Sequence, residues 1–398
     1  MSLRLLTAGE SHGPWQMALL EGVPAGLPYD PDRLQAHMRR RQIGHGRSGR
    51  QRIEQDTPEI HGGIRHGRTT GAPVAIAIPN LDHARWTEVM DPRQPDQAIT
   101  GEAQAPGRIS RLRPGHADYP GVVKYGLEDV RDVLERASAR ETVARVAAAG
   151  ILMPLLEAAG IRLTSHVRTI GPVTADLPWL DNQPDIVPRL RDEAEASPVR
   201  CADPEASAAM VAAIDAAGKA GDSLGGVFEV IVTGLPVGLG SHVQWDRRLD
   251  GRLAQAVMSI QAVKGVSFGD AFEAAKHPGS AVHDAFAGQF DRTSNRAGGL
   301  EGGMTNGQPL VVRGAMKPIS TLRRPLQGAR WPDGEPAPAH FERADVCAVP
   351  AAGVVAEAMV TYILADALLE KSGGDSLAEV LAHLEATRRL AHPTEHPR

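Results

Sequence analysis

Hydrophobic and polar residues follow two spacings along the chain, one typical of strands and the other of helices. Short apolar or alternating stretches predict strands at residues 3–7, 161–170, 227–233 and 311–315. Alanine-rich stretches with apolar positions at helical spacing predict helices near residues 138–159, 205–219, 252–261, 353–371 and 376–390. Because the strands do not alternate regularly with helices, the pattern predicts an α+β fold and not a doubly wound sheet.

Two helices carry recognisable end signals. Asp30 predicts a helix start as N-cap, with Pro31 in the first helical position. Ser138 and Glu141 have the spacing of a capping box, and Gly160 predicts the end of the same helix.

One short segment recurs about half a chain later. Glu-Gly-Val-Pro-Ala-Gly-Leu at 21–27 resembles Thr-Gly-Leu-Pro-Val-Gly-Leu at 233–239, and each follows a strand-like stretch and precedes a helix. Chance in a chain rich in glycine and proline is one explanation. The other is a single domain over residues 1–390, built from pseudo-twofold halves at roughly 1–220 and 221–390. Residues 391–398 are expected to fray.

Composition excludes several classes of protein. Hydrophobic residues make up 42% and charged residues 23% of the 398 positions, as in globular proteins. The net charge of −5 gives no global attraction to nucleic acid or to an anionic membrane. Cys201 and Cys347 match neither a disulfide framework nor a metal site. Since there is no signal pattern and no apolar run of roughly 18 residues, we expect a cytoplasmic protein without membrane association.

The first candidate for chemistry is Gly-Glu-Ser-His-Gly at 9–13, directly after the first predicted strand. The two glycines allow a tight turn around Ser11 and His12. An imidazole at such a turn can donate or accept a proton near neutral pH. A purely structural turn remains the alternative.

A run of arginines follows. Between Asp32 and Glu54 the chain has seven arginines, Arg41, Arg47 and Arg50 among them, and no acidic residue. A solvated basic face, a nucleic-acid backbone site and a pocket for a small polyanion are all compatible with this pattern. Interleaved aromatic residues are missing, which weakens the nucleic-acid interpretation.

A second basic loop favours the pocket. Arg113, His116 and Asp118 lie together in a Pro-Gly turn, where Asp118 could orient the imidazole or its neighbours. Guanidinium groups grip phosphate and carboxylate in bidentate fashion. A solvated basic face does not require a rigid turn that positions a histidine.

Three later segments could contribute to the same pocket. The glycine-rich run 295–303 would let backbone approach a ligand closely. Lys-Pro-Ile-Ser-Thr at 317–321 offers a cation and hydroxyl groups suited to a phosphate. Arg343 and Asp345 stand two apart, so in an extended segment both side chains would lie on one face.

In combination and in this order, these segments resemble the chorismate synthase family, from Gly9 to Asp366. The matching motifs are those at 9–13, 41–50, 113–118, 135–142, 259–266, 295–303, 317–321 and 343–347. Leu112 stands where the family usually has proline, and Ala137 where serine is common. Neither position supplies a proton or a charge to the chemistry. Ser48-Gly49 makes the arginine loop slightly unusual and leaves the role of Arg50 open.

The resemblance implies a 1,4-elimination of phosphate from 5-enolpyruvylshikimate 3-phosphate, giving chorismate. It also implies reduced FMN as cofactor, reduced with NADPH by the protein itself or by a separate reductase. The implied fold is a helical layer between antiparallel sheets, assembled as a homotetramer.

The same resemblance implies roles for individual residues. His12 would be the acid near the departing phosphate, with Ser11 beside it. His116 would protonate or neutralise the reduced flavin, and Asp345 would relay the abstracted proton near flavin N5. Implied substrate-binding residues are Arg41, Arg47, Arg50 and Arg113. Implied FMN-binding residues are Arg136, Ala137, Ser138, Gln261, Ala262, Gly302, Lys317, Pro318, Ile319, Ser320, Thr321 and Arg343, of which Arg343 is also a candidate substrate contact.

Overall fold

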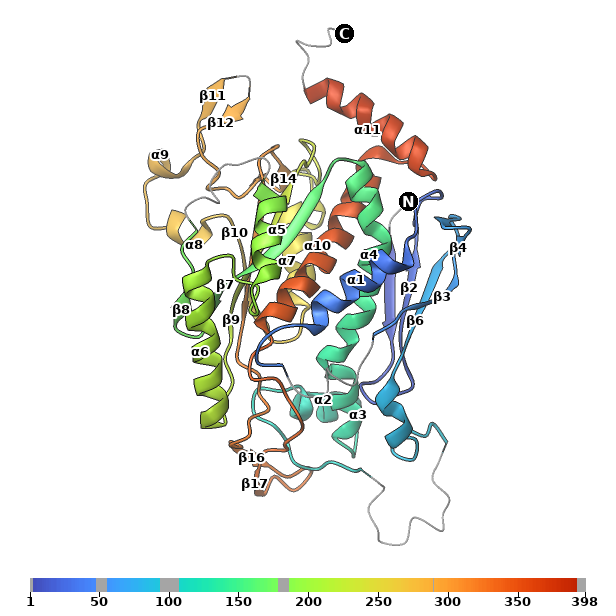
Figure 1. The fold of residues 1–398 in the computed structure, drawn as a ribbon, viewed down its shortest axis with the longest axis vertical. Helices are drawn as coiled ribbons and strands as arrows, with labels where there is room; N and C mark the ends of the chain where they lie inside the picture. The colour runs from blue at the N-terminus through green and yellow to red at the C-terminus, as the bar shows by residue number, and fades with distance from the viewer. Residues whose placement is uncertain (1–2, 48–55, 94–106, 178–185, 289, 392–398) are drawn as a thin grey trace.

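Two antiparallel sheets lie on either side of a layer of helices in the computed structural model (Figure 1). The structure describes residues 3–47, 56–93, 107–177, 186–288 and 290–391. Its mixture of helices with antiparallel sheets confirms the predicted α+β class.

The first sheet comes from the N-terminal part of the chain. Its strand order is β1 (Arg4–Ala8), β2 (Trp15–Glu21), β6 (Val74–Pro79) and β3 (Glu59–Gly62), and all neighbours are antiparallel. Leu20 and Ile78 point into the main core, whereas Met17 and Leu19 lie exposed on the opposite face. The strands therefore bury one face only.

The second sheet is covered on both faces. Its order is β10 (Val263–Phe268), β15 (Leu310–Met316), β9 (Gly226–Thr233), β7 (Arg162–Ile170) and β8 (Val173–Thr174). Phe228 and Val230 join the main core, while Ile231 packs in a separate cluster with Leu190 of helix α5. The predicted strands at 161–170, 227–233 and 311–315 are thus confirmed.

The other elements are short hairpins and helices. The hairpins pair β4 (Ile64–Arg65) with β5 (Arg68–Thr69), β11 (Phe286–Gly288) with β12 (Asp291–Arg292), β13 (Leu300–Glu301) with β14 (Met304–Thr305), and β16 (Gln327–Ala329) with β17 (Pro336–Pro338). The helices are α1 (Pro31–Gln42), α2 (Asp118–Tyr125), α3 (Arg131–Ala137), α4 (Thr142–Ala158), α5 (Ile186–Ala196), α6 (Pro204–Ala220), α7 (Leu249–Met258), α8 (Ala271–Ala274), α9 (Gly279–Val282), α10 (Val349–Ser372) and α11 (Leu377–Ala391), with 3₁₀ turns η2 (Leu81–Arg85), η4 (Ala139–Glu141) and η6 (Trp245–Arg247).

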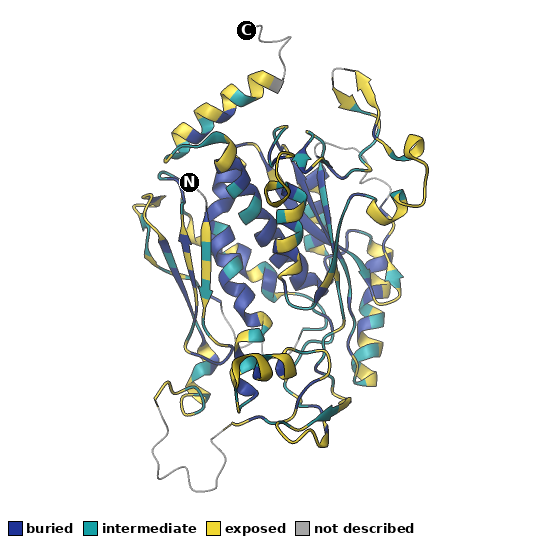
Figure 2. Ribbon diagram, turned by 180° about the vertical axis from the view of Figure 1, so that it is seen from behind, coloured by how far each residue is buried: buried dark blue, intermediate teal, exposed yellow. Residues whose placement is uncertain are grey.

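Helices α4 and α10 form the centre of the molecule. They contact each other; α4 also contacts β2 and β6, and α10 contacts β7 and β9. Figure 2 shows buried residues concentrated on these central helices. By length and composition α10 could span a membrane, but 83% of its apolar window is buried inside the protein. That burial is typical of a core helix, which is apolar on all sides.

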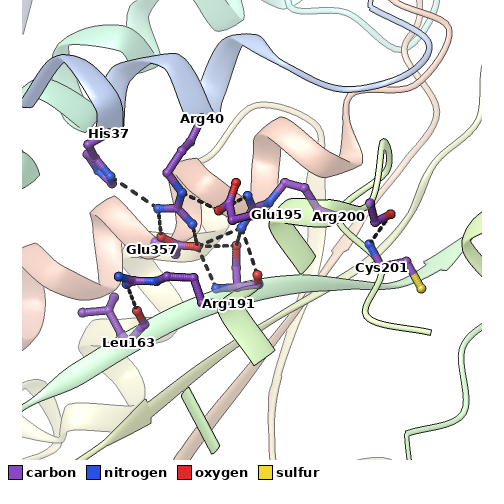
Figure 3. A network of polar contacts seen from close by, with 10 residues as sticks. His37, Arg40, Leu163, Arg191, Glu195, Arg200, Cys201 and Glu357 are labelled. Atoms are coloured by element: carbon purple, nitrogen blue, oxygen red, sulfur yellow. Dashed lines mark hydrogen bonds and ion pairs between the residues drawn. The ribbon is translucent and has the colours of Figure 1, made fainter. Parts of the chain in front are cut away.

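A cluster of buried charges crosses the helical layer (Figure 3). Glu357 of α10 accepts hydrogen bonds from two guanidinium nitrogens of Arg40 at 2.6 and 2.8 Å. Arg200 donates to Glu357 at 3.3 Å, and Ser165 donates to it through its N–H at 2.7 Å and its hydroxyl at 2.6 Å. Burial would raise the pKa of Glu357, but the Arg40 and Arg200 charges and these hydrogen bonds hold it well below its usual range.

The helix-end predictions had different outcomes. Asp30 accepts hydrogen bonds from the first-turn N–H groups of α1, as predicted. The predicted capping box is wrong. Ser138 accepts from the N–H of Arg140 and so caps η4, while the Glu141 carboxylate accepts hydrogen bonds from Thr7 and Arg145. Glu141 is thus held by Thr7, which is distant in sequence, and by Arg145 one helical turn later.

Candidate active site

A cavity of about 530 Å³ lies where the first turn of α10 meets the loops that precede α2 and α4. Ser11, the end of α1 and the segments around residues 113–117, 137–142, 260–262, 316–321 and 342–345 complete its walls. Its size and its mixture of charged and apolar lining residues suit a small-molecule site.

Most predicted site residues meet in this cavity. Those that line it are Ser11, Arg41, Arg47, Arg113, His116, Ala137, Ser138, Gln261, Ala262, Lys317, Ile319, Ser320, Thr321, Arg343 and Asp345. They come from segments that span nearly the whole sequence, so the fold assembles one site from distant motifs.

Other predicted residues do not line the cavity. His12 is buried beside Ser11, and Pro318 is exposed next to Lys317. Arg136 turns away, because its guanidinium donates to the carbonyl oxygens of residues 7 and 9 and to the residue 7 hydroxyl. Gly302 lies in the turn between β13 and β14. Arg50 lies outside the described residues.

The first histidine of the site, His116, is held by a buried carboxylate. Its Nδ1 lies 2.6 Å from Oδ1 of Asp118. Arg113 donates to the same carboxylate from Nε to Oδ2 and from a terminal nitrogen to Oδ1, both at 2.9 Å. Burial would raise the pKa of Asp118, but the hydrogen bonds from His116 and Arg113 hold it well below its usual range. Nδ1 also lies 3.0 Å from a terminal nitrogen of Arg113, but its shorter contact is with the ionised carboxylate, which can only accept. We therefore assign the proton to Nδ1, which leaves Nε2 for chemistry.

The second histidine, His12, has its own carboxylate partner. Oε1 of Glu135 lies 2.8 Å from its Nδ1, and Oε2 accepts the His12 backbone N–H at 2.8 Å. Arg131 donates to the same carboxylate at 2.8 Å, and Trp86 packs on the imidazole with ring centroids 3.9 Å apart. These contacts fix the position and ring plane of His12 behind Ser11.

Two cavity arginines share a third carboxylate. Arg41, in the last turn of α1, donates to Oδ2 of Asp56 at 2.7 Å, and Arg140 donates to Oδ1 at 3.1 Å. Asp56 is completely buried. Burial would raise its pKa, but the two guanidinium charges outweigh burial and lower it. One anion between two cations leaves a net positive charge at this wall.

The opposite part of the site contains two further carboxylates. Arg47 donates to Oδ2 of Asp345 at 2.6 Å. Glu342 lines the cavity nearby and lies 3.5 Å from His340. Burial would raise the Glu342 pKa, but the hydrogen bond with His340 and the charges of Arg113 and His340 lower it. Glu342 is therefore ionised within a largely cationic cavity.

One wall offers groups suited to a planar ring and a phosphate. Gln261 donates from Nε2 to Glu141 at 3.3 Å, while its buried Oε1 has no hydrogen-bond partner among the described residues. Lys317 donates to the carbonyl of Gly115 at 2.5 Å, and the hydroxyl groups of Ser320 and Thr321 share the same wall. The cavity lining therefore includes an acceptor without a partner among the described residues, a cation and two hydroxyl groups.

The structure also revises two interpretations of the sequence. Arg40 and Arg41 are largely buried and paired with carboxylates, so they form neither a solvated basic face nor a backbone site for nucleic acid. Two of the four glycines of the 295–303 run meet neighbouring backbone: a Cβ at Gly298 would lie 2.3 Å from the nitrogen of residue 269, and one at Gly299 would lie 2.6 Å from a carbonyl oxygen. Chain packing therefore accounts for these glycines without a ligand.

Sequence reasoning missed four residues of the site. Arg140 and Glu342 line the cavity, and Asp56 and Glu135 hold residues that line it or flank it. Arg140 falls within a motif that carried the resemblance, and Glu342 directly precedes Arg343. Glu135 begins that same motif and pairs with Arg131 four residues earlier, whereas Asp56 has no local signal, because Arg41 and Arg140 lie 15 and 84 residues away.

Comparison with known proteins gives a consistent result. The family model described as chorismate synthase matches residues 3–369. A chorismate synthase from Acidothermus cellulolyticus is 55% identical over 390 residues, covering 96% of this chain and 98% of that protein. One from Thermobifida fusca is 54% identical over 388 residues, covering 96% and 97%. A crystal structure of chorismate synthase matches with a TM-score of 0.77 at 41% identity, covering 98% and 99%. The chain therefore belongs to the chorismate synthase family and has the lyase activity for which that family is named.

Proposed function

We propose that the chain removes phosphate from 5-enolpyruvylshikimate 3-phosphate by 1,4-elimination in this cavity, giving chorismate. One observation carries the proposal. Arg41, Arg47 and Arg113 share the walls of a single cavity with His116 and Asp345. A trianionic substrate needs such cations, and its elimination needs groups that move a proton.

The arginines bind and orient the substrate. Arg41, Arg47 and Arg113 each have one carboxylate partner, at 2.7, 2.6 and 2.9 Å. These partners fix the guanidinium planes before the substrate arrives, so binding requires little rearrangement. The phosphate and the two carboxylates of the substrate bind to the guanidinium groups that line the cavity, those of Arg140 and Arg343 included.

His116 balances charge in the cavity. With its Nδ1–H directed to ionised Asp118, the imidazole holds or releases a proton at Nε2. A cation at this position offsets negative charge on the reacting groups. Asp118 keeps the ring in the required tautomer, as carboxylates do for other catalytic histidines.

Ser11 and His12 act on the departing phosphate. Ser11 lines the cavity and His12 is buried directly beside it, so a proton from His12 passes the Ser11 side chain to reach the leaving group. Asp345, held by Arg47, relays the proton abstracted from the substrate carbon. The elimination thus has one acid and one proton relay within the same site.

The cavity also fits the implied cofactor, reduced FMN. The unpartnered Oε1 of Gln261 can accept an N–H from a planar ring, and Lys317, Ser320 and Thr321 can hold a phosphate. Reduced FMN held by these residues would supply the electron density that the elimination needs, with no net redox change. Either NADPH or a separate flavin reductase supplies its electrons.

We further infer that the chain is one domain built from two related halves. The hydroxyl of Thr69 donates to the carbonyl of Pro24 at 2.6 Å, and that of Thr305 donates to the carbonyl of Pro236 at 2.6 Å. Leu27 and Leu239, each three residues after its proline, donate their N–H groups to these threonine hydroxyls at 2.9 and 2.8 Å, respectively. The strand order β1-β2-β6-β3 corresponds to β7-β9-β15-β10.

The resemblance also supports the helical sandwich, a homotetramer and a cytoplasmic location.

An anaerobic assay tests the proposed reaction. Chorismate formation from the enolpyruvyl phosphate is followed by absorbance, with reduced FMN, with oxidised FMN and without flavin. Turnover is expected only with reduced FMN. Equal turnover without flavin would instead indicate direct acid–base elimination by the two histidines, and the assignment of the cofactor would be wrong.

A further inference from the structure

We propose that Asp56 is a positioning residue for the substrate, because it locks the guanidinium groups of Arg41 and Arg140 in one wall of the cavity. The inference rests on the proposed function, since it takes the cavity as the substrate site. Asp56 itself does not line the cavity. It would act only through the two arginines that do.

The geometry separates Asp56 from an ordinary surface ion pair. Its side chain has no exposed surface, and the side chains of Arg41 and Arg140 are only 5% and 4% exposed. Each carboxylate oxygen takes one guanidinium, at 2.7 and 3.1 Å. With water excluded, neither arginine can exchange this partner for solvent, so the carboxylate determines where both cations lie.

Asp56 is also fixed at its backbone. Gln35 of α1 donates from Nε2 to the Asp56 carbonyl oxygen at 3.1 Å. Arg41 comes from the last turn of α1 and Arg140 from η4, which directly precedes α4. Asp56 therefore ties the end of one helix to the start of another at the edge of the cavity.

The arrangement leaves Arg41 able to bind an anion. Its Nε is buried and has no hydrogen-bond partner among the described residues. Because this atom has almost no accessible surface, an anion in the cavity would be held by the other guanidinium atoms of Arg41, which lines the cavity. Asp56 thus holds a cation at the wall where an anion is expected.

Charge and geometry predict opposite effects for Asp56→Asn. If only net charge mattered, removing an anion from this site would tighten binding of a trianionic substrate. If position matters, the two released guanidinium groups repel each other, move apart and bind the substrate less well. We expect KM to rise about tenfold or more with kcat within about fivefold, which is the pattern for lost uniform binding.

Glu357→Gln is the matched control. Glu357 is also a buried carboxylate between two arginines, but its partners Arg40 and Arg200 do not line the cavity. This control should leave KM within about twofold of the parent. An equal rise of KM in both variants would mean general loss of stability and would overturn the proposal, as would an unchanged or lower KM in Asp56→Asn.

A second comparison covers the case in which Asp56→Asn does not fold. The double variant Arg140→Gln with Asp56→Asn removes one cation together with one anion. Its KM should exceed that of Arg140→Gln alone by about tenfold, because Arg41 loses its anchor; equal values overturn the proposal. Isothermal titration with the enolpyruvyl phosphate should show the same ratios in Kd. If the parent protein does not convert this substrate, the proposed function fails whatever the variants show.

Discussion

Asp118→Asn tests the chemistry of the site with little change of shape. The carboxylate accepts hydrogen bonds from the N–H and two side-chain nitrogens of Arg113, and it lies 2.6 Å from Nδ1 of His116. An amide keeps one acceptor oxygen, so at least two of these contacts are lost or reversed. Each is charge-assisted and worth about 1.5–3 kcal/mol. A total of about 3 kcal/mol corresponds to roughly a 100-fold loss of rate.

The assay is anaerobic turnover with reduced FMN at saturating substrate. We expect kcat of Asp118→Asn to fall about 100-fold, because the amide no longer fixes the proton on Nδ1 of His116. His116→Ala, which removes the group itself, should cost roughly 10²-fold or more. The kcat of the double variant should lie within about threefold of that of His116→Ala, since the aspartate acts through the histidine.

Two results would refute this reasoning. A kcat within about threefold of the parent for either single variant would show that His116 moves no essential proton. Independent, multiplying effects in the double variant would show that Asp118 acts by another route, such as placing Arg113. Circular dichroism spectra of all variants establish that the fold is intact.

Three further predictions concern charge in the core and in the cavity. Burial first, then the charge of Arg40, lowers the pKa of His37 from 6.5 to about 4. Between pH 6.5 and about 4, His37 is protonated in the unfolded chain and neutral in the folded chain. The free energy of unfolding should therefore fall by up to about 3 kcal/mol as pH drops through this range. Urea unfolding should show a shallower slope in His37→Gln than in the parent, because only the contribution of the carboxylates with lowered pKa values remains. Glu357→Gln should lower the unfolding free energy by about 3–5 kcal/mol in the same assay at pH 7; a loss below 1 kcal/mol would contradict it. Arg47→Ala should raise KM about tenfold, and an unchanged KM with a lower melting temperature would make Arg47 purely structural.

The fold could be predicted where local signals decide it. Asp30 begins α1 because its side chain and the following proline act within one turn. The strands at 162–170 and 226–233 follow from alternation and β-branched residues. The capping prediction at Ser138 failed because Thr7, far away in sequence, and Arg145, one turn along the helix, hold Glu141.

The candidate site divides in the same way. Arginines and histidines in rigid turns were found from residue type and spacing, and the family resemblance connected motifs far apart in sequence. Asp56 could not be found, because it is defined by partners brought together in folding, and the contact of Glu135 with His12 could not be found for the same reason. Gly302 and Arg136 remain predictions, since neither lines the cavity in this chain.

The adjacent arginines of α1 have a consequence for how this protein can change. Arg40 turns to Glu357 in the interior, while Arg41 turns to Asp56 at the cavity. Successive residues of a helix are rotated by about 100°, so each guanidinium reaches its own carboxylate only in this register. Inserting or deleting one residue within α1 would swing both charges away from their anions at once. Length variation among descendants of this sequence should therefore be confined to the loops that flank the helix.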